Sequence, residues 1–586
     1  MTTKMKKIYK KLAVLLFLLV GACNLDGDLQ NPNEVNVGGA DVNLIMNAIQ
    51  LDFGDLYYTA STTVDPLVRG MFAMAGGFRY QTANQPQGND GLWIQSYQNV
   101  LVNAELMIPL ATAKGLTTHI AAAEIMEAYT YMMLVDIFGD VPQSEALQGP
   151  AGNFNPKADG GASVYAKALS LLDDARVQLA KTGANVGGAL TRDIYYGGSR
   201  TLWNALANTL ELRMQMNLGT AAANARIAVL IDATKTDIID KADGSENFTY
   251  KYGIATVPDS RHPLYNTHYQ PTKGAAGGYL SNYFMHEAYG IWNTTSPTDY
   301  TLVIEDPRWR YYFYRQVGSI KQMNAVDPKA VGCTPGSNPN HYISGPGPTD
   351  VTGVSATGSV FCIFDPGFYG RDHGDASGTP PSGPVQTVAG VYPAGGTFDN
   401  TAISDQSSYF GSTIRGDGAN GAGINPIWMS FYTDFLKAEY YSKTGNAALA
   451  KSSMDAGIAN SVAQVKAFAV AKGAKNTIQS TAKQASVLAA YAANADLRLS
   501  VATKPLDVIG REFFIAAWGN GLEQYNLYRR TSAPRNLQPT LQIGPGPWLR
   551  TQVYPSVYVN LNQNAAQKDA NATVKTFWDT NPDVLN

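Results

Sequence analysis

Few residues of this chain have the types and spacing that enzyme chemistry requires. The 586-residue sequence has no GxSxG nucleophile elbow, no P-loop and no GxGxxG turn after a strand. His286-Glu287 lacks the second histidine of a zinc-protease helix, and the scattered histidines, without a CxxC pair, give no support to a zinc site. Paired carboxylates for glycoside hydrolysis can lie far apart in a chain, but nothing singles out such a pair here. An enzyme, as a surface glycosidase or peptidase, is therefore the second hypothesis rather than the first.

One acidic stretch has the ligands for a metal ion. Asp365 to Asp375, with Asp372 between them, supplies enough carboxylate oxygens for a Ca²⁺ loop. The stretch lacks the spacing of an EF-hand, and a solvated acidic loop is the simpler interpretation. The sequence therefore predicts no cofactor, with Ca²⁺ as the alternative.

Aromatic side chains beside polar ones are the best candidates for ligand contacts. A Tyr or Trp ring can cover an apolar face of a ligand while amides and carboxylates pair with the ligand's polar groups. Asn89, Asp90 and Trp93 combine these groups in a loop-like stretch directly before a helix, so we expect Trp93 at the rim of a site. The alternative for Trp93 is packing on the helix below. Further candidates, each with polar or glycine neighbours, are Arg79, Tyr80, Tyr283 and Trp292.

The middle of the chain divides into two pieces of unlike composition. Residues 248–315 hold 16 Phe, Trp and Tyr in 68 positions, against 10% for the whole chain. Because aromatic residues bury well, about two-thirds of them are expected in the core. Residues 319–425 hold 19 glycines in 107 positions, with proline-rich turns, which predicts loops and short strands.

The N-terminus has the form of an export signal. Five lysines between Lys4 and Lys11 precede nine unbroken apolar residues, Leu12 to Val20, which is too short to span a bilayer. Small residues then lead to Cys23, an arrangement similar to a bacterial lipobox, in which the cysteine is diacylated. The sequence therefore predicts a signal peptide at 1–22 and a lipid anchor at Cys23, because several acyl chains hold a protein stably to a membrane. The acidic residues after Cys23 favour a cell-surface lipoprotein of the outer membrane.

Charge and cysteine content fit an exported protein. The formal net charge is −3, and removing the five leader lysines from the 44 basic residues leaves 39 against 47 acidic ones. That balance excludes the basic footprint of a nucleic-acid-binding protein. The two remaining cysteines, Cys333 and Cys362, are an even pair in an oxidising compartment, so we expect a disulfide between them.

Helical periodicity fills both ends of the chain. It runs from about residue 94 to 245, where Tyr97, Leu101, Ala104 and Ile108 form one helical stripe. It stops until residue 426, and then predicts helices at 428–441, 447–468, 483–500 and 505–530. Helix pairs with short links suggest stacked hairpins of the tetratricopeptide kind. The expected divisions are an N-terminal helical region at 23–245, a ligand-binding region at 246–425 and a C-terminal helical region at 426–586.

One stretch of these helices carries a motif. Residues 127–147 read EAYTYMMLVDIFGDVPQSEAL, and Asn155-Pro156 and Val164-Tyr165 follow. This pattern resembles the SusD/RagB family of outer-membrane nutrient-binding lipoproteins. Other positions that fit the family pattern are Trp93, Tyr97, Asn103, Asp306-Pro307-Arg308, Leu436 to Glu439, Gly445, Glu512-Phe513, Gly519, Leu522-Glu523, Arg529 to Thr531 and Tyr554-Pro555.

The resemblance implies a mainly α fold, in which tetratricopeptide-like hairpins carry an irregular, loop-rich ligand-binding region. It implies capture of oligosaccharides or polysaccharides at the cell surface and their delivery to a SusC-like TonB-dependent β-barrel transporter, without enzymatic activity. Peptide capture by a RagB-like relative is the alternative. The motif residues at a helix end and the tight turn after it are expected to have a structural role, with Gly139 as the left-handed cap and Pro142 stopping the helix; they are Asp136, Phe138, Gly139, Asp140 and Pro142. Glu512 and Arg529 are expected in a helix-to-helix ion pair.

Overall fold

The computed structural model describes two helical halves and parts of the region between them. The described residues are 40–74, 83, 85–183, 186–269, 279–292, 302–316, 318, 363–364, 367–374, 386–400, 418–535, 537–538, 540, 542, 544–569 and 573–582. Cys23, Cys333, Cys362, Arg79 and Tyr80 lie outside them, and the side chain of Trp292 is not described.

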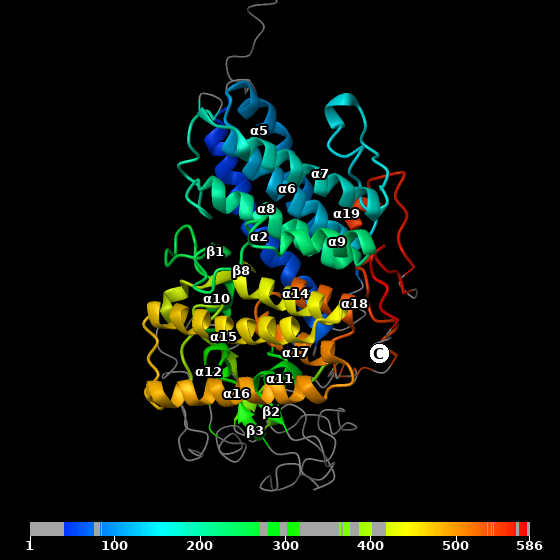
Figure 1. The fold of residues 1–586 in the computed structure, drawn as a ribbon. Helices are drawn as coiled ribbons and strands as arrows, with labels where there is room; N and C mark the ends of the chain where they lie inside the picture. The colour runs from blue at the N-terminus through cyan, green and yellow to red at the C-terminus, as the bar shows by residue number, and fades with distance from the viewer. Residues whose placement is uncertain are drawn as a thin grey trace, which may run out of the picture.

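The N-terminal half is a stack of long helices (Figure 1). Helix α6 is buried along its whole length, and its alanine-rich sequence lets neighbouring helices approach closely. One close approach is at Gly161, the first residue of α7, where an added Cβ would meet Val135 Cγ1 at 3.0 Å. The helices of this half are α2 (Val42–Val64), α5 (Val102–Ala113), α6 (Thr117–Phe138), α7 (Gly161–Ala180), α8 (Arg200–Leu218) and α9 (Ala221–Leu230), with a short 3₁₀ turn η6 (Gly149–Ala151) between α6 and α7.

Helix α2 is absent from the sequence-based expectation. Its buried face includes Gln50 and Ser61, and these polar residues interrupt the apolar stripe that reveals a helix in a sequence. Both are buried because they find partners: Gln50 Oε1 accepts from the Ile194 N–H at 2.8 Å, and Ser61 Oγ from the Gly521 N–H at 2.8 Å.

Between α2 and α5 the chain makes several short helical segments. They are η3 (Asp65–Val68), η4 (Pro86–Asn89), α4 (Asp90–Ile94) and the π-helical segment η5 (Gln95–Leu101), which runs directly into α5. Tyr97, Leu101 and Ala104 of the predicted stripe are buried, and Ile108 packs partly buried against the core.

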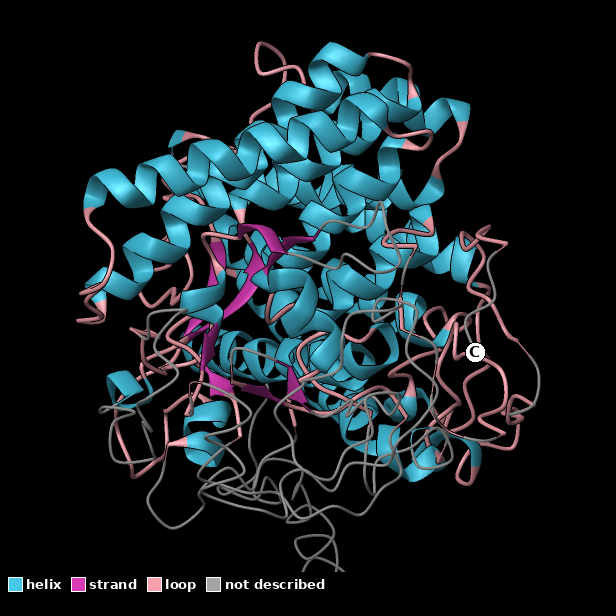
Figure 2. Ribbon diagram, turned by 90° about the horizontal axis from the view of Figure 1, so that it is seen from below, coloured by secondary structure: helices cyan, strands magenta, loops and turns pink. Residues whose placement is uncertain are grey.

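The middle region contains short helices and two-stranded antiparallel pairs. Strand β1 (Phe248–Lys251) pairs with β8 (Ile424–Trp428), with Phe248 opposite Trp428 and Lys251 opposite Ile424. The other pairs are β2 (Gly290–Trp292) with β3 (Leu302–Glu305), β4 (Phe313–Tyr314) with β7 (Val388–Ala389), and β5 (Ile363–Phe364) with β6 (Phe368–Tyr369). In Figure 2 these strands lie among the helices rather than in a separate sheet layer.

The sequence predicts no helices between residues 245 and 426, and this prediction is wrong in detail. The structure has α10 (Pro263–His268), α11 (Asn282–Tyr289) and α12 (Trp309–Tyr312) there, with a short η10 (Gly418–Gly421). These helices have eight residues or fewer, which is shorter than the window in which helical periodicity can be recognised.

The C-terminal half is built from α14 (Ser430–Lys443), α15 (Ala447–Ala471), α16 (Thr481–Val501), α17 (Pro505–Ala516) and α18 (Gly521–Thr531), followed by the short α19 (Ser556–Val559). The first three match the expected helices closely. The single helix expected at 505–530 is two helices, because Gly519 takes a φ of +81° between them. An added Cβ there would meet Pro393 Cγ at 2.3 Å, so the break also lets another segment pass close by.

Candidate functional site

Trp93 lies within a cluster of aromatic rings. Only 8% of its surface is exposed, and its ring centroid is 4.6 Å from that of Tyr558 and 4.8 Å from that of Tyr97. The Phe138 ring lies 5.5 Å away, at 78° to the plane of the Trp93 ring. This arrangement is the packing alternative, and no broad ring face of Trp93 is left for a sugar. A ligand contact at Trp93 therefore remains a prediction that the packing does not support.

Asn89 and Asp90 join the start of α4 to the C-terminal segment. Asn89 Nδ2 donates to the Val553 carbonyl at 3.0 Å. The Asp90 carboxylate accepts from Ser556 Oγ at 2.5 Å and from the Val557 N–H at 3.1 Å. Asp90 therefore holds the start of α19 against α4, and Asn89 holds the residues just before α19 against η4.

The other candidates do not gather around Trp93. Tyr283 is fully buried in α11, with its ring 6.2 Å from Phe514 of α17. Trp292 ends β2, and Arg79 and Tyr80 fall outside the described residues. Of the fourteen aromatic side chains described between 248 and 315, nine are buried, in agreement with the expected two-thirds. The partly exposed ones are Tyr250, Tyr252, Tyr265, Tyr269 and Tyr279.

The motif residue Asp136 faces inward and accepts four hydrogen bonds. Oδ2 accepts from Arg213 Nη1 and Asn526 Nδ2, both at 2.9 Å. Oδ1 accepts from Trp578 Nε1 at 3.0 Å and from Tyr165 Oη. These donors come from α8, α18, the C-terminal segment and α7, so one carboxylate joins distant parts of the chain.

The rest of the motif forms the turn after α6. Gly139 ends the helix with a φ of +79°. Asp140 Oδ1 accepts from the Gly161 N–H at 2.8 Å and so fixes the start of α7. The Pro142 carbonyl accepts from Tyr97 Oη at 2.7 Å. The structural role expected for the motif is confirmed.

Glu512 is ion-paired, but neither with Arg529 nor with another helix: Arg308 directly precedes α12, and Arg511 is its neighbour on α17. The Glu512 carboxylate lies 3.0 Å from Arg308 Nη2 and 2.8 Å from Arg511 Nη1. Arg529 instead donates to the Arg550 carbonyl at 2.7 Å and lies 3.8 Å above the Tyr525 ring. The expected partner for Arg529 is therefore wrong, because a backbone oxygen and an aromatic face satisfy its charge.

The calcium alternative finds no support in the described residues. Asp372 is buried, and Asp365 and Asp375 lie outside the description. Within the described ranges, no three His, Cys, Asp or Glu side chains are grouped so that they could hold a metal ion.

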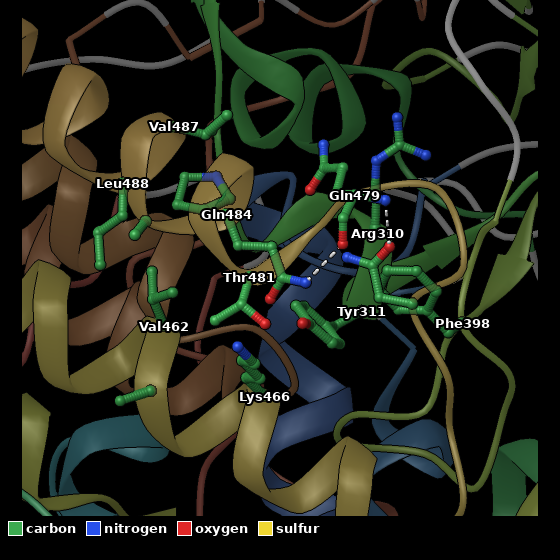
Figure 3. Close-up of a pocket in the computed structure, with 14 residues that line it drawn as sticks. Arg310, Tyr311, Phe398, Val462, Lys466, Gln479, Thr481, Gln484, Val487 and Leu488 are labelled. Atoms are coloured by element: carbon green, nitrogen blue, oxygen red, sulfur yellow. Dashed lines mark hydrogen bonds between the residues drawn. The ribbon is translucent and has the colours of Figure 1, made fainter.

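A small pocket of about 260 Å³ opens between α15 and α16 (Figure 3). Tyr311 and Phe398 lie together at one side, with ring centroids 4.8 Å apart, and burial raises the pKa of Tyr311 to about 12. Gln484 Nε2 donates to the Gln479 carbonyl at 2.9 Å at the rim. The pocket is mostly apolar and lies below the usual 300–1,000 Å³ of ligand pockets. It suits one small apolar group better than a chain of sugars.

A larger cleft of about 580 Å³ lies where the two helical halves meet. We call it the β1–α15 cleft. It is lined by the start of α8 and the residues before it, the turn 243–247, strands β1 and β8, and the last turns of α15. Its volume falls within the range of ligand pockets, and its walls combine aromatic, amide, hydroxyl and charged side chains.

The walls of the β1–α15 cleft are held by hydrogen bonds. Asn247 Nδ2 donates to Gln464 Oε1 at 2.9 Å, and Gln464 Nε2 donates to the Ala242 carbonyl at 3.0 Å. The hydroxyls of Tyr195 and Tyr196 donate to backbone carbonyls at 2.9 and 3.0 Å. The cleft is thus pre-formed, and the groups that remain for a ligand are its hydroxyls, its charged side chains and the partly exposed ring of Phe468.

Comparison with known protein families decides the assignment. A model of the SusD-like family, described as starch-binding and associating with the outer membrane, matches residues 33–333, just over half of the chain. The chain belongs to the SusD-like family. The resemblance drawn from the motif at 127–147 is thereby confirmed, and the family is one of binding proteins. No curated protein matches the chain.

SusD-like structures superpose on almost the entire chain, which confirms the mainly α fold. A SusD/RagB family protein from Bacteroides thetaiotaomicron is 16% identical, with 90% of this chain and 95% of the other covered and a TM-score of 0.57. A chitin-binding protein is 17% identical, with coverages of 92% and 100% and a TM-score of 0.58. A chitin-binding SusD homologue from Flavobacterium johnsoniae is 16% identical, with coverages of 93% and 99% and a TM-score of 0.55. At these low sequence identities, the matches show that the fold is similar and nothing more.

The helices were also compared with the requirements of a membrane span. Among the helices that the structure describes, none combines the length and the apolar content needed to cross a bilayer.

Proposed function

We propose that this SusD-like protein binds oligosaccharides or polysaccharides at the cell surface and delivers them to a SusC-like TonB-dependent β-barrel. Its family is described as starch-binding and associating with the outer membrane, and two structural neighbours are named as chitin-binding. The protein contributes binding and no bond cleavage.

The observation that carries the glycan proposal is the make-up of the β1–α15 cleft. Sugars present hydroxyls around a ring with C–H faces, so their sites combine polar groups with aromatic surfaces. The cleft supplies Ser245 and Thr249 hydroxyls, charged side chains and the Phe468 ring within one hollow. Its fixed walls reduce the ordering that binding requires, which favours affinity.

Membrane attachment and the transporter complete the proposal. A signal peptide at 1–22 and acylation of Cys23 would tether the mature protein to the outer membrane, and a Cys333–Cys362 disulfide would cross-link the glycine-rich region. The lipid-tethered protein would sit over the barrel and release its glycan into it.

Glycan binding is tested with the purified lipoprotein in detergent, by a glycan array followed by calorimetry. We expect saturable binding of at least one oligosaccharide class and no release of reducing sugar over hours. Phe468→Ala should lower the affinity about 5- to 150-fold, the equivalent of the roughly 1–3 kcal/mol of one aromatic face. Phe154→Ala is the matched control, because Phe154 is 73% exposed and lies outside the cleft.

Three outcomes would overturn the proposal. Release of reducing sugar would identify an enzyme. Binding of peptides without any glycan would favour the RagB-like alternative. Equal affinities of the wild type and Phe468→Ala would move the glycan site away from the cleft.

A further inference from the structure

The β1–α15 cleft contains two lysines from distant parts of the chain. Lys251 is the last residue of β1, and Lys472 follows the last residue of α15. The Lys472 ammonium lies 5.5 Å above the centroid of the Phe468 ring. Burial, together with the charge of Lys251, lowers the pKa of Lys472, so the two cations are close enough to repel each other.

The neighbouring carboxylates are bound to other groups, although one of them, Asp243, also lines the cleft. The Asp243 carboxylate accepts from the Ser245 N–H at 2.9 Å in its own turn. Glu246 lies 2.6 Å from Lys241 Nζ, and Asp240 lies 2.7 Å from Lys437 Nζ. Within the described ranges, no ion pair includes Lys251 or Lys472.

Helix stabilisation explains only one of the two lysines. A cation after the last turn of α15 suits the negative end of the helix dipole, so Lys472 by itself needs no ligand. Lys251 comes from a strand, and its charge makes the position of Lys472 less favourable. Two like charges in one hollow are unfavourable in the absence of a compensating anion. The pair is also a local excess of positive charge in a chain of net negative charge, which would attract anions to this hollow.

We propose that the β1–α15 cleft binds an anionic saccharide, with Lys251 and Lys472 holding its carboxylate or sulfate group. The inference rests on the proposed function and specifies its substrate class. Hydroxyl side chains and the Phe468 ring lie beside the lysines, so the same hollow offers contacts for both the acidic group and the sugar that carries it.

The test is calorimetry on the detergent-solubilised lipoprotein with probes that differ in charge. Oligogalacturonate is compared with its methyl ester, which keeps the sugar chain and removes the charge. A sulfated dextran oligosaccharide is compared with unsulfated dextran, so that the two sources of negative charge are separated. An oligoglutamate peptide is the third arm.

We expect at least one anionic saccharide to bind more tightly than its uncharged form. Lys472→Met and Lys251→Met should each weaken that binding about 10- to 100-fold, as expected for loss of a charge-assisted contact. Lys472→Arg should retain most of it. Lys483→Met is the charge-matched control, because Lys483 is exposed on α16 away from the cleft. Binding should also weaken when salt is raised from about 50 to about 500 mM, because ions screen exposed charges.

Each contrary outcome has a separate meaning. If neutral glycans bind and the anionic probes gain nothing from their charge, the inference fails and the proposed function stands. If anionic saccharides bind equally well to both lysine variants, the site lies elsewhere and the inference also fails. If oligoglutamate alone binds in a lysine-dependent way, both the saccharide class and the proposed function are wrong. Unchanged thermal midpoints of the variants exclude misfolding as the cause.

Discussion

Helix α8 connects two polar regions that are built in opposite ways. Its second half carries Arg213, whose guanidinium lies 2.9 Å from Asp136 and 2.5 Å from Glu523, with all three side chains inaccessible to solvent. Its first turn carries Leu202, which lines the cleft that contains Lys251 and Lys472. In the first region opposite charges are paired, and in the second two lysines lie together and neither is ion-paired to Asp243, which also lines the cleft.

The difference follows from solvent access. A fully buried charge must be paired and hydrogen-bonded, because its desolvation is otherwise too unfavourable. The cleft is open, so water supports its lysines when no ligand is present. A site of this kind can keep charges available for binding, whereas the interior around Asp136 can only use charges to hold helices together.

The largest expected effect is in the buried region. Asp136→Ala leaves Arg213 without one of its two carboxylates and removes the acceptor for Tyr165, Asn526 and Trp578. We expect a loss of about 3–5 kcal/mol in the free energy of unfolding, measured by urea denaturation, because several buried donors lose their acceptor at once and Arg213 keeps only Glu523.

An exposed ion pair provides the control for Asp136. The Asp173 side chain is 72% exposed and lies 2.5 Å from Arg176. Asp173→Ala should cost less than about 1 kcal/mol. A similarly small loss in Asp136→Ala would mean that the motif does not hold the framework, and the contrast drawn along α8 would be lost.

A slightly smaller effect is expected for Trp93→Ala. Its ring packs on Tyr97 and Tyr558, so its removal should lower the free energy of unfolding by about 3 kcal/mol. This value is at the lower end of the range for buried Phe or Trp, because the short helix α19 can move inward to fill the space. Glycan affinity of the folded variant should stay near that of the wild type. Calorimetry and a melting curve distinguish the roles: lost affinity with an unchanged midpoint would make Trp93 a ligand contact after all.

The framework could be predicted from the sequence because its signals are local. The stripes of α7 and α8 repeat at helical spacing, and the FGDVP turn contains its own glycine, at Gly139, and proline. Even so, the partners of Asp136 come from α7, α8, α18 and the C-terminal segment, which no local pattern connects. The sequence indicated that the motif was structural without showing what it joins.

The β1–α15 cleft could not be predicted in the same way. Lys251, Phe468 and Lys472 come from a four-residue strand and from the end of a helix far along the chain, and each is an ordinary residue in its own segment. Only the pairing of β1 with β8, and the packing of α15 beside them, brings them together. Trp93 was a better candidate by neighbouring residue types, but its burial depends on contacts with Tyr558, which is equally remote in sequence.

The smallest expected effect is on the stability of the ligand-free cleft. Lys472→Met removes a charge that is partly buried and repelled by Lys251, but it also removes a cation from the negative end of α15. These contributions oppose each other, so the free energy of unfolding should change by less than about 1 kcal/mol. A saturating anionic glycan at about 100 times its Kd should stabilise the wild type by about 2.7 kcal/mol and the variant far less, because ligand binding to the folded state adds to its stability. Urea denaturation with and without glycan measures both quantities. A loss of several kcal/mol without ligand would place Lys472 in the framework, in the same class as Arg213, and would remove the distinction between the two ends of α8.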